Sequence, residues 1–197
     1  MKIILASKNR KKLIELREIL RDIGVEVYSP EELEINIPDV EEDGSTFVEN
    51  ALKKARSAHL YSGLPAIADD SGICVDALGG APGVYSARYA GDHCDDDDNN
   101  RKLLDALSEV EDRRGRFACA IAYVDDQQSH TVEGFCEGVV LRAPRGEGGF
   151  GYDPLFQPTG FEESFGSLPK EVKNRISHRY KAIVALKQFL QTVQQPV

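Results

Sequence analysis

Cations gather at the start of the first expected helix, in the segment Ser7-Lys8-Asn9-Arg10-Lys11-Lys12. A helix N-terminus offers free backbone N–H groups and a partial positive charge, so it favours anions such as phosphate. Lysine and arginine have the wrong sign for helix stability at that end, which favours anion binding as their role. The alternative is that Ser7 or Asn9 only caps the helix while the cations are solvated.

Two acidic residues, Asp69 and Asp70, follow the short apolar run Ala66-Ile67-Ala68, which we expect to be a buried strand. Open α/β sheets bind ligands at the ends of their strands. Adjacent strand residues point to opposite faces, so one aspartate can face a ligand while the other braces the loop. Carboxylates completed by substrate phosphates suit Mg²⁺. A solvated turn, which Asp, Ser and Gly also favour, is the competing interpretation.

Two further acidic segments contain candidate metal ligands. Glu41-Glu42-Asp43-Gly44 precedes the second expected helix, on which Asn50 and Lys54 are four residues apart and share a face. Acidic residues before a helix commonly serve its dipole, so this segment indicates little by itself. The run Asp95 to Asp98 is interpreted as a solvated loop and helix start, because consecutive carboxylates do not converge without a defined loop.

Aromatic residues stand among glycines in the segment Gly148-Gly149-Phe150-Gly151-Tyr152-Asp153-Pro154. Glycine lets the backbone approach a ligand closely, an aromatic side chain stacks on a flat ring, and an aspartate accepts hydrogen bonds from it. A tight loop with a core aromatic is the alternative. Further along, Lys173 precedes Ser177-His178-Arg179, which opens the last expected helix, where His and Arg are again disfavoured by the helix dipole. His178 alone is more typical of a packed or surface histidine than of a catalyst.

The elements that must position these segments alternate between strands and helices. Lys2 to Ala6 and Val25 to Tyr28 are predicted strands on either side of a helix that ends at Gly24, an opening typical of α/β proteins. Thr46 begins a second helix with capping-box spacing, and Gly63 ends it. The remaining expected elements are a helix carrying Leu103, Leu104 and Leu107, strands at 117–124 and 131–141, and a final amphipathic helix at 177–193.

Composition excludes several classes of protein. With 41% apolar and 29% charged residues, the chain has the balance of a globular protein, and we expect a single domain over residues 1–197. The N-terminal apolar run is too short for a signal peptide, so we expect a cytoplasmic protein that does not bind membranes. Four scattered cysteines without a paired motif predict free thiols. A net charge of −9 argues against binding nucleic acid.

The motifs occur in one order along nearly the whole chain. They are Ser-x-Asn-x-x-Lys, Thr-Phe-x-Glu-Asn-Ala-x-x-Lys-Ala, Ala-Asp-Asp-Ser-Gly, Gly-Gly-Ala-Pro-Gly-Val-Tyr-Ser-Ala-Arg-Tyr, Gly-Gly-x-Gly-Tyr-Asp-Pro and Ser-His-Arg. This order resembles the inosine/xanthosine triphosphate pyrophosphatase family, also called Ham1-like or RdgB-like. Each motif alone is weak, whereas their shared order is specific.

The resemblance implies an elongated, two-lobed α/β fold with a central mixed β-sheet flanked by helices and an active-site cleft between the lobes. It implies a homodimer and a Mg²⁺-dependent reaction. The substrates would be the purine triphosphates ITP, dITP and XTP, each hydrolysed to the nucleoside monophosphate and pyrophosphate. The role would be to remove these nucleotides from the precursor pool of DNA and RNA.

The resemblance also implies roles for particular residues. Asp70 would be the proton acceptor and a metal ligand, Asp69 is the alternative acceptor, and Glu42 would be the second metal ligand. Lys12 would stabilise the leaving pyrophosphate. The positions expected to contact the substrate are Ser7, Lys8, Asn9, Arg10, Lys11, Lys12, Lys54, Ser71, Phe150, Gly151, Tyr152, Asp153, Lys173, His178 and Arg179.

Two other functions fit the same residues. A phosphatase that releases orthophosphate from nucleotides or sugar phosphates would use the same basic segment and acidic metal site. A nucleotide sensor without enzymatic activity would bind a triphosphate tightly and not turn it over. Product analysis separates the phosphatase from the pyrophosphatase, and the absence of turnover would identify the sensor.

Overall fold

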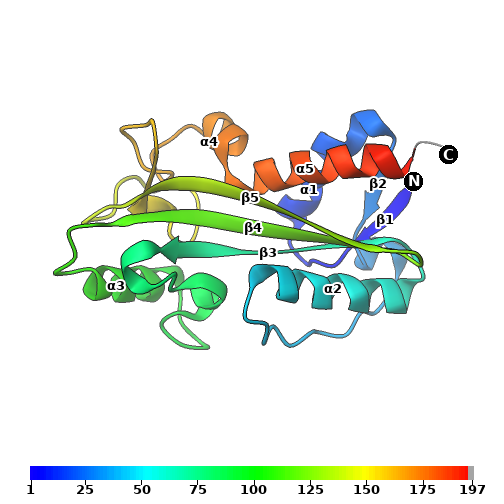
Figure 1. Ribbon diagram of the computed structural model, residues 1–197, viewed down its shortest axis with the longest axis horizontal. Helices are drawn as coiled ribbons and strands as arrows, with labels where there is room; N and C mark the ends of the chain where they lie inside the picture. The colour runs from blue at the N-terminus through cyan, green and yellow to red at the C-terminus, as the bar shows by residue number, and fades with distance from the viewer. Residues whose placement is uncertain (195–197) are drawn as a thin grey trace. The chain divides into compact units, whose positions relative to one another are not determined.

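The structure, a computed structural model, describes residues 1–194 (Figure 1). The chain packs as two compact units. Unit 1 comprises Met1–Asp70, Cys119–Gly134 and the C-terminal residues from Lys181 on, and unit 2 comprises Ser71–Ala118 and Phe135–Tyr180. Within the described part, no helix is both long and apolar enough to cross a membrane. All four cysteines are free thiols, as the sequence predicts.

The strands form a mixed β-sheet in the order β2-β1-β3-β4-β5-β6. β1 pairs in parallel with β2 and β3, whereas β6 pairs antiparallel with β5. The parallel pairs reflect the strand–helix–strand connections predicted for the N-terminal part of the chain. The strands are β1 (Lys2–Leu5), β2 (Glu26–Tyr28), β3 (Ala66–Val75), β4 (Arg114–Val124), β5 (Ser129–Val140) and β6 (Phe156–Pro158).

The helices begin and end largely where the sequence signals predict. The α-helices are α1 (Arg10–Leu20), α2 (Phe47–Ser62), α3 (Asp96–Ala106), α4 (Lys170–Ile176) and α5 (His178–Val193). At the start of α2, Thr46 Oγ1 accepts a hydrogen bond from the Glu49 N–H at 3.1 Å. Gly63 ends that helix with a φ of 66°, the left-handed conformation that favours glycine.

In unit 1 both faces of the sheet are covered by helices, because alternate strand residues point to opposite sides. Figure 1 shows α1 and α5 on one side of the strands and α2 on the other. The first face packs Ile3, Leu5, Ile67, Cys119, Ile121 and Tyr123 against leucines of α1 and apolar residues of α5. The second packs Ile4, Ala66, Ala68, Ala120, Ala122 and Val124 against Ala51, Ala55 and Ala58 of α2. The small alanine side chains let α2 lie close to the strands, which brings its polar residues near the strand backbone.

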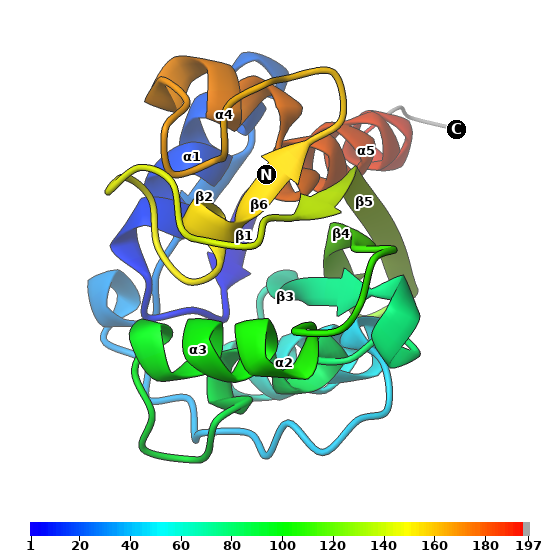
Figure 2. The ribbon, with the colours of Figure 1, turned by 90° about the vertical axis from the view of Figure 1, so that its left-hand side faces the viewer.

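Unit 2 has its own core, which is rich in aromatic residues. The ring of Phe117 lies edge-on to that of Phe156, with the ring centres 4.7 Å apart, and Phe165 packs beside them. Leu103 and Leu107 of α3 are fully buried in the same core. Figure 2 shows α3 in green, and β6 in yellow beside β5.

The structure corrects the sequence prediction in the region that matters most for function. β3 does not end before Asp69 but continues through Asp-Asp-Ser-Gly to Val75. The strand persists because helices flank both aspartates, so their side chains have partners on either face. Residues 83–88 form a 3-10 helix, which sequence signals do not reveal because its tighter winding lacks the apolar period of an α-helix. The short strand β6 was not predicted, since its three residues are too few to show an alternation.

Candidate active site

Charged side chains from β3, α1, α2 and the segment before α2 meet in unit 1. We call this group, formed by Lys12, Glu42, Asn50, Lys54, Asp69 and Asp70, the carboxylate–lysine cluster. Within it, the two neighbouring aspartates of β3 contact different helices, as the strand alternation requires. Asp69 contacts α1 and Asp70 contacts α2, so the strand supplies one carboxylate to each side.

On the α1 side, Lys12 Nζ lies 2.8 Å from Asp69 Oδ2, and both side chains are largely buried, at 19% and 7% exposure. The neighbouring cations are arranged differently: Lys8, Arg10 and Lys11 are exposed, and Lys8 pairs with Asp39 on the surface. Lys12 is therefore the cation of the N-terminal segment that the structure places beside the carboxylates.

The backbone of the same segment is held by local caps. Asn9 Oδ1 accepts hydrogen bonds from the N–H groups of Lys11 and Lys12 at 2.9 and 3.4 Å. Ser7 Oγ accepts a hydrogen bond from the Asn9 N–H at 3.2 Å. Asn9 therefore caps α1, as the alternative interpretation of this segment predicts. The cap fixes the first turn of the helix, from which the Lys12 side chain extends.

On the α2 side, Asn50 Nδ2 donates a hydrogen bond to Asp70 Oδ2 at 3.0 Å, and Lys54 Nζ lies 3.6 Å from Asp70 Oδ1. Lys54 also pairs with Glu42 at 2.8 Å, so it lies between the Glu42 and Asp70 carboxyl groups. Burial and the neighbouring Glu42 raise the pKa of Asp70, against the opposing effects of Lys54 and Asn50. Two carboxyl groups therefore crowd each other around one lysine.

Asn50 was not among the predicted substrate or metal residues, although its shared face with Lys54 was a signal. Its side chain does two things: Nδ2 donates to Asp70, and Oδ1 accepts a hydrogen bond from the Gly44 N–H at 2.8 Å. A Cβ on Gly44 would lie 2.6 Å from Asn50 Oδ1, so only glycine permits this approach. Asn50 thereby holds the segment that carries Glu42 against β3.

A second polar group lies in unit 2, in the Gly-rich loop formed by residues 148–153. Asp153 is almost fully buried and pairs with Lys173 of α4, and its Oδ2 also accepts a hydrogen bond from the Phe150 N–H at 2.8 Å. Lys173 Nζ lies 4.8 Å from the centre of the Phe150 ring and 5.5 Å from that of Phe165. Burial raises the pKa of Asp153 above its ordinary value, and this effect outweighs the lowering by the nearby Lys173.

The two aromatic residues of the Gly-rich loop have different surroundings. Phe150 is 58% exposed, although it is a large apolar side chain. Tyr152 is 5% exposed, packs in the unit 2 core and donates its hydroxyl hydrogen to the Ser86 carbonyl oxygen at 2.7 Å. Tyr152 is thus an aromatic residue of the core, as the alternative interpretation of this loop predicts. The exposed ring of Phe150 is available to a ligand.

The predicted residues at the start of α5 also lie in unit 2. The ring of His178 stacks on that of Phe117 at 4.9 Å, so the histidine is packed against the core. Ser177 Oγ accepts a hydrogen bond from the Tyr180 N–H at 3.1 Å, as a helix N-cap does. The charge of Arg179 lowers the pKa of Asp153, which places this cation within electrostatic reach of the Gly-rich loop. Ser71 follows Asp70 in β3 and is partly buried.

Comparison with known proteins assigns the chain to a family. A model of the Ham1 family matches residues 3–189. The chain belongs to the Ham1 family. A dITP/XTP pyrophosphatase from Desulforamulus reducens is 52% identical over 186 residues, which cover 93% of this chain and 92% of the relative. A HAM1 protein structure from Coxiella burnetii matches with a TM-score of 0.91 at 43% identity, covering 98% of this chain and 99% of that one.

A third match shares the fold of this Ham1 family member. The crystal structure of a nucleoside-triphosphatase or dITP/XTP pyrophosphatase from Mycobacterium abscessus is 44% identical, with a TM-score of 0.81, and covers 94% of this chain and 98% of that one. The mixed sheet flanked by helices is therefore the architecture of the Ham1 family.

The donor set in unit 1 fits a divalent cation that takes part of its coordination from a substrate. Asp70 and Glu42 offer carboxylate oxygens from two different segments, and both lie beside Lys54. Among residues 1–194 there is no group of three or more His, Cys, Asp and Glu side chains arranged to hold a metal. An incomplete oxygen site of this kind suits Mg²⁺, which retains waters and binds substrate phosphates.

Proposed function

We propose that this Ham1 family member hydrolyses purine nucleoside triphosphates of the ITP, dITP and XTP type to the monophosphate and pyrophosphate. The observation that carries the proposal is the carboxylate–lysine cluster, in which Lys12 contacts Asp69 while Lys54 lies between Glu42 and Asp70. Buried lysines beside crowded carboxylates suit a polyphosphate and a divalent cation together. The names of the similar enzymes from D. reducens and M. abscessus support the substrate class.

Asp70 and Glu42 would hold Mg²⁺, which when bound neutralises phosphate charge and lowers the pKa of water. The chain's own residues perform the rest. Asn50 and Lys54 hold the two carboxylates in place from α2. Lys12 supplies positive charge for the triphosphate from the first turn of α1, in a buried setting where its charge is poorly screened by water.

The chemical step is a displacement at the α-phosphorus. The oxygen of a water molecule forms a bond to the α-phosphorus, and the bond from that phosphorus to the bridging oxygen breaks. Pyrophosphate leaves with the bonding electron pair, and the water proton passes to the Asp70 carboxylate. Lys12 stabilises the negative charge that accumulates on the leaving pyrophosphate.

We assign recognition of the purine base of the substrate to residues of unit 2. Hypoxanthine and xanthine carry a carbonyl group where adenine carries an amino group. Hydrogen-bond donors such as Arg179 and His178 suit the carbonyl and would leave the amino group of adenine unpaired. An unpaired buried donor costs about 1–3 kcal/mol, which is roughly a tenfold to hundredfold preference. Phe150 would supply a ring on which the flat base stacks.

The experiment that tests the proposal is incubation with ITP, dITP, XTP, ATP and GTP, with and without Mg²⁺, followed by chromatography of the products. We expect IMP and pyrophosphate from ITP, a requirement for Mg²⁺, and slow turnover of ATP and GTP. Orthophosphate and IDP would instead identify a phosphatase. Tight binding of ITP without turnover would identify a nucleotide sensor.

We further infer that the enzyme works as a homodimer and that it removes these nucleotides from the precursor pool. The family resemblance supports both statements. Light scattering coupled to size-exclusion chromatography tests the first, with a mass twice that of the chain expected. For the second, loss of the gene should raise the hypoxanthine content of DNA, and an unchanged content would contradict it.

A further inference from the structure

Both main-chain polar groups of Gly151 are bound by side chains of one helix. Asp96 Oδ2 accepts a hydrogen bond from the Gly151 N–H at 2.6 Å, and Asn100 Nδ2 donates one to the Gly151 carbonyl oxygen at 3.0 Å. Asp96 and Asn100 are four residues apart on α3, so they project from the same face of the helix. The acidic run at the start of α3, interpreted from the sequence as solvated, thus includes a residue with a defined partner 55 positions away.

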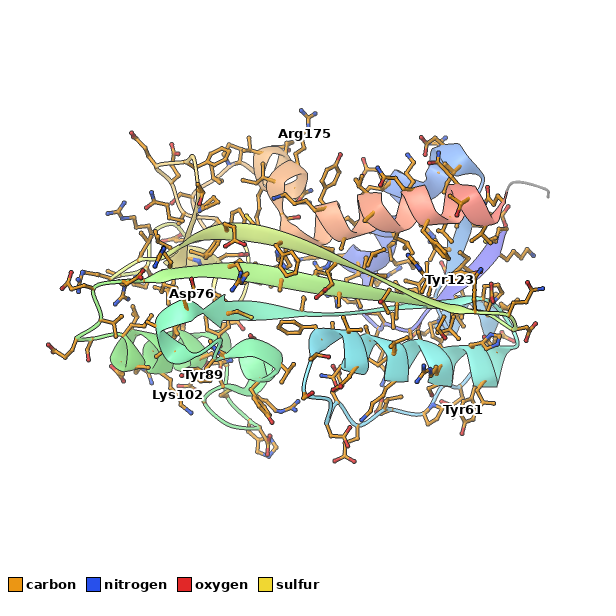
Figure 3. All side chains as sticks on the ribbon, viewed as in Figure 1. Tyr61, Asp76, Tyr89, Lys102, Tyr123 and Arg175 are labelled. Atoms are coloured by element: carbon orange, nitrogen blue, oxygen red, sulfur yellow. The ribbon has the colours of Figure 1, made fainter. Side chains whose placement is uncertain are left out.

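The helix that provides these contacts is itself firmly anchored in unit 2. Asp95 and Asp98 form a capping box at its N-terminus. Asn99 Oδ1 accepts a hydrogen bond from the Ala90 N–H at 2.8 Å. Lys102, labelled with Tyr89 in Figure 3, donates to the Tyr89 carbonyl oxygen and lies 4.6 Å from the centre of its ring. α3 is therefore a rigid support rather than a mobile surface helix.

The loop needs such a support because its backbone is irregular. Gly149 and Gly151 have φ values of 85° and 59°, so both sides of Phe150 adopt left-handed conformations that belong to no regular element. Backbone groups outside regular structure require partners from elsewhere. Asp153 binds the N–H of Phe150, and α3 binds the next residue at both its N–H and its carbonyl. Together these contacts set the direction in which the exposed Phe150 ring points.

We propose that Asp96 and Asn100 are positioning residues that fix the Gly-rich loop so that Phe150 is presented to the purine base. This inference rests on the proposed function, because it assigns the base contact to Phe150. Neither residue needs to touch the substrate. Since stacking on the base is the same in the bound substrate and in the transition state, loosening the loop raises KM while kcat changes little.

The variants are Asp96→Ala, Asp96→Asn and, as matched control, Asp97→Ala. Asp97 is exposed in the same helical turn, and among residues 1–194 its side chain forms no hydrogen bond or ion pair. Removing either aspartate takes the same charge from the helix N-terminus, so the control cancels any effect on helix stability. The asparagine variant keeps a side-chain oxygen that can accept the Gly151 hydrogen bond. Asn100→Ala tests the second contact independently.

Two readouts are measured on each protein. Hydrogen–deuterium exchange without nucleotide follows the peptide covering residues 148–153, and steady-state kinetics with ITP gives KM and kcat. For Asp96→Ala we expect exchange roughly tenfold faster and KM about fivefold higher, with kcat within about twofold. Asn100→Ala should shift both in the same direction, whereas Asp96→Asn and Asp97→Ala should stay within about twofold of the original protein.

Faster exchange together with a higher KM in Asp96→Ala, but not in Asp97→Ala, supports the positioning role. Unchanged exchange shows that Asp96 does not hold the loop, and unchanged KM shows that the held loop does not matter for substrate; either result overturns the proposal. A fall in kcat with KM unchanged overturns it as well. Failure of the proposed function is visible separately, because the unmodified enzyme would then not hydrolyse ITP.

Discussion

Each unit contains a buried aspartate–lysine pair, but the two pairs have different surroundings. In unit 1, Asp69 and Lys12 are joined by Asp70, Glu42 and Lys54, so carboxylates outnumber lysines. In unit 2, Asp153 and Lys173 lie among the rings of Phe150 and Phe165, and one carboxylate faces one lysine.

This difference indicates a division of labour. An excess of buried negative charge is unfavourable unless a proton or a cation compensates it. The carboxylates of unit 1 therefore favour the binding of a cation or a proton. A neutralised pair beside an exposed aromatic ring provides shape, stacking and hydrogen bonding instead. We therefore expect changes in unit 1 to act on the chemical step and changes in unit 2 to act on base recognition.

The largest effect is expected for Asp70→Asn. The substitution keeps the shape of the side chain but removes the proposed proton acceptor and proposed metal ligand, so kcat should fall on the order of a thousandfold or more. Circular dichroism should show an intact fold. The control is Asp43→Asn, a surface residue that pairs with Lys53 outside the cluster, which should keep normal activity. Turnover close to normal in Asp70→Asn would remove Asp70 from the mechanism.

The next effect is expected for Lys12→Met, which removes the buried cation beside Asp69. We expect kcat/KM for ITP to fall about a hundredfold, and inorganic tripolyphosphate, which has no base, to inhibit more weakly. Lys53→Met, at an exposed position that pairs with Asp43 outside the cluster, is the control and should behave as the original protein. Equal effects of the two substitutions would show that general surface charge, and not the Lys12–Asp69 contact, attracts the triphosphate.

A smaller effect on activity, with a larger effect on stability, is expected for Lys173→Met. The substitution leaves Asp153 buried without its lysine, which costs about 3–5 kcal/mol of unfolding free energy, measured by urea denaturation. KM for ITP should rise about tenfold, while inhibition by tripolyphosphate stays unchanged. Lys170→Met, an exposed residue at the start of the same helix, should alter neither quantity. Weaker tripolyphosphate inhibition in Lys173→Met would contradict the division between the two units.

The smallest effect is expected for Phe150→Leu. Loss of the aromatic stack should raise KM for ITP by about threefold to tenfold, since stacking contributes about 0.5–1.5 kcal/mol. Stability should change little, because the ring is exposed. Phe150→Tyr keeps the stacking surface and should restore most of the affinity. A leucine variant with the same KM as the original protein would exclude Phe150 from base binding.

Local signals predicted much of this molecule from the sequence. The cap at Thr46 and the stop at Gly63 of α2 depend on neighbouring residues, and both predictions are confirmed. The extension of β3 through Asp69 and Asp70 was not predicted, because Asp, Ser and Gly are typical of turns and only distant partners keep them in the sheet. Local sequence propensity carries no information about contacts between residues so far apart in the chain.

The same reason explains the site residues that the sequence did not reveal. Asn50 donates a hydrogen bond to Asp70, 20 positions away, and Asp96 accepts one from Gly151, 55 positions away. Their residue types are common at helix starts and on helix faces, so composition alone gives no reason to single them out. The order of the sequence motifs singled out Asp70 and Lys12. The residues that support these motifs became apparent only from the three-dimensional structure.

The central claim is that water attacks the α-phosphorus of a triphosphate held by the carboxylate–lysine cluster. It is tested most directly by hydrolysing ITP with Mg²⁺ in water labelled with heavy oxygen and analysing both products by mass spectrometry. We predict one heavy oxygen in the phosphate of IMP and none in pyrophosphate, and no detectable product from Asp70→Asn within the same reaction time. Label in pyrophosphate, or release of orthophosphate in place of pyrophosphate, would contradict the account.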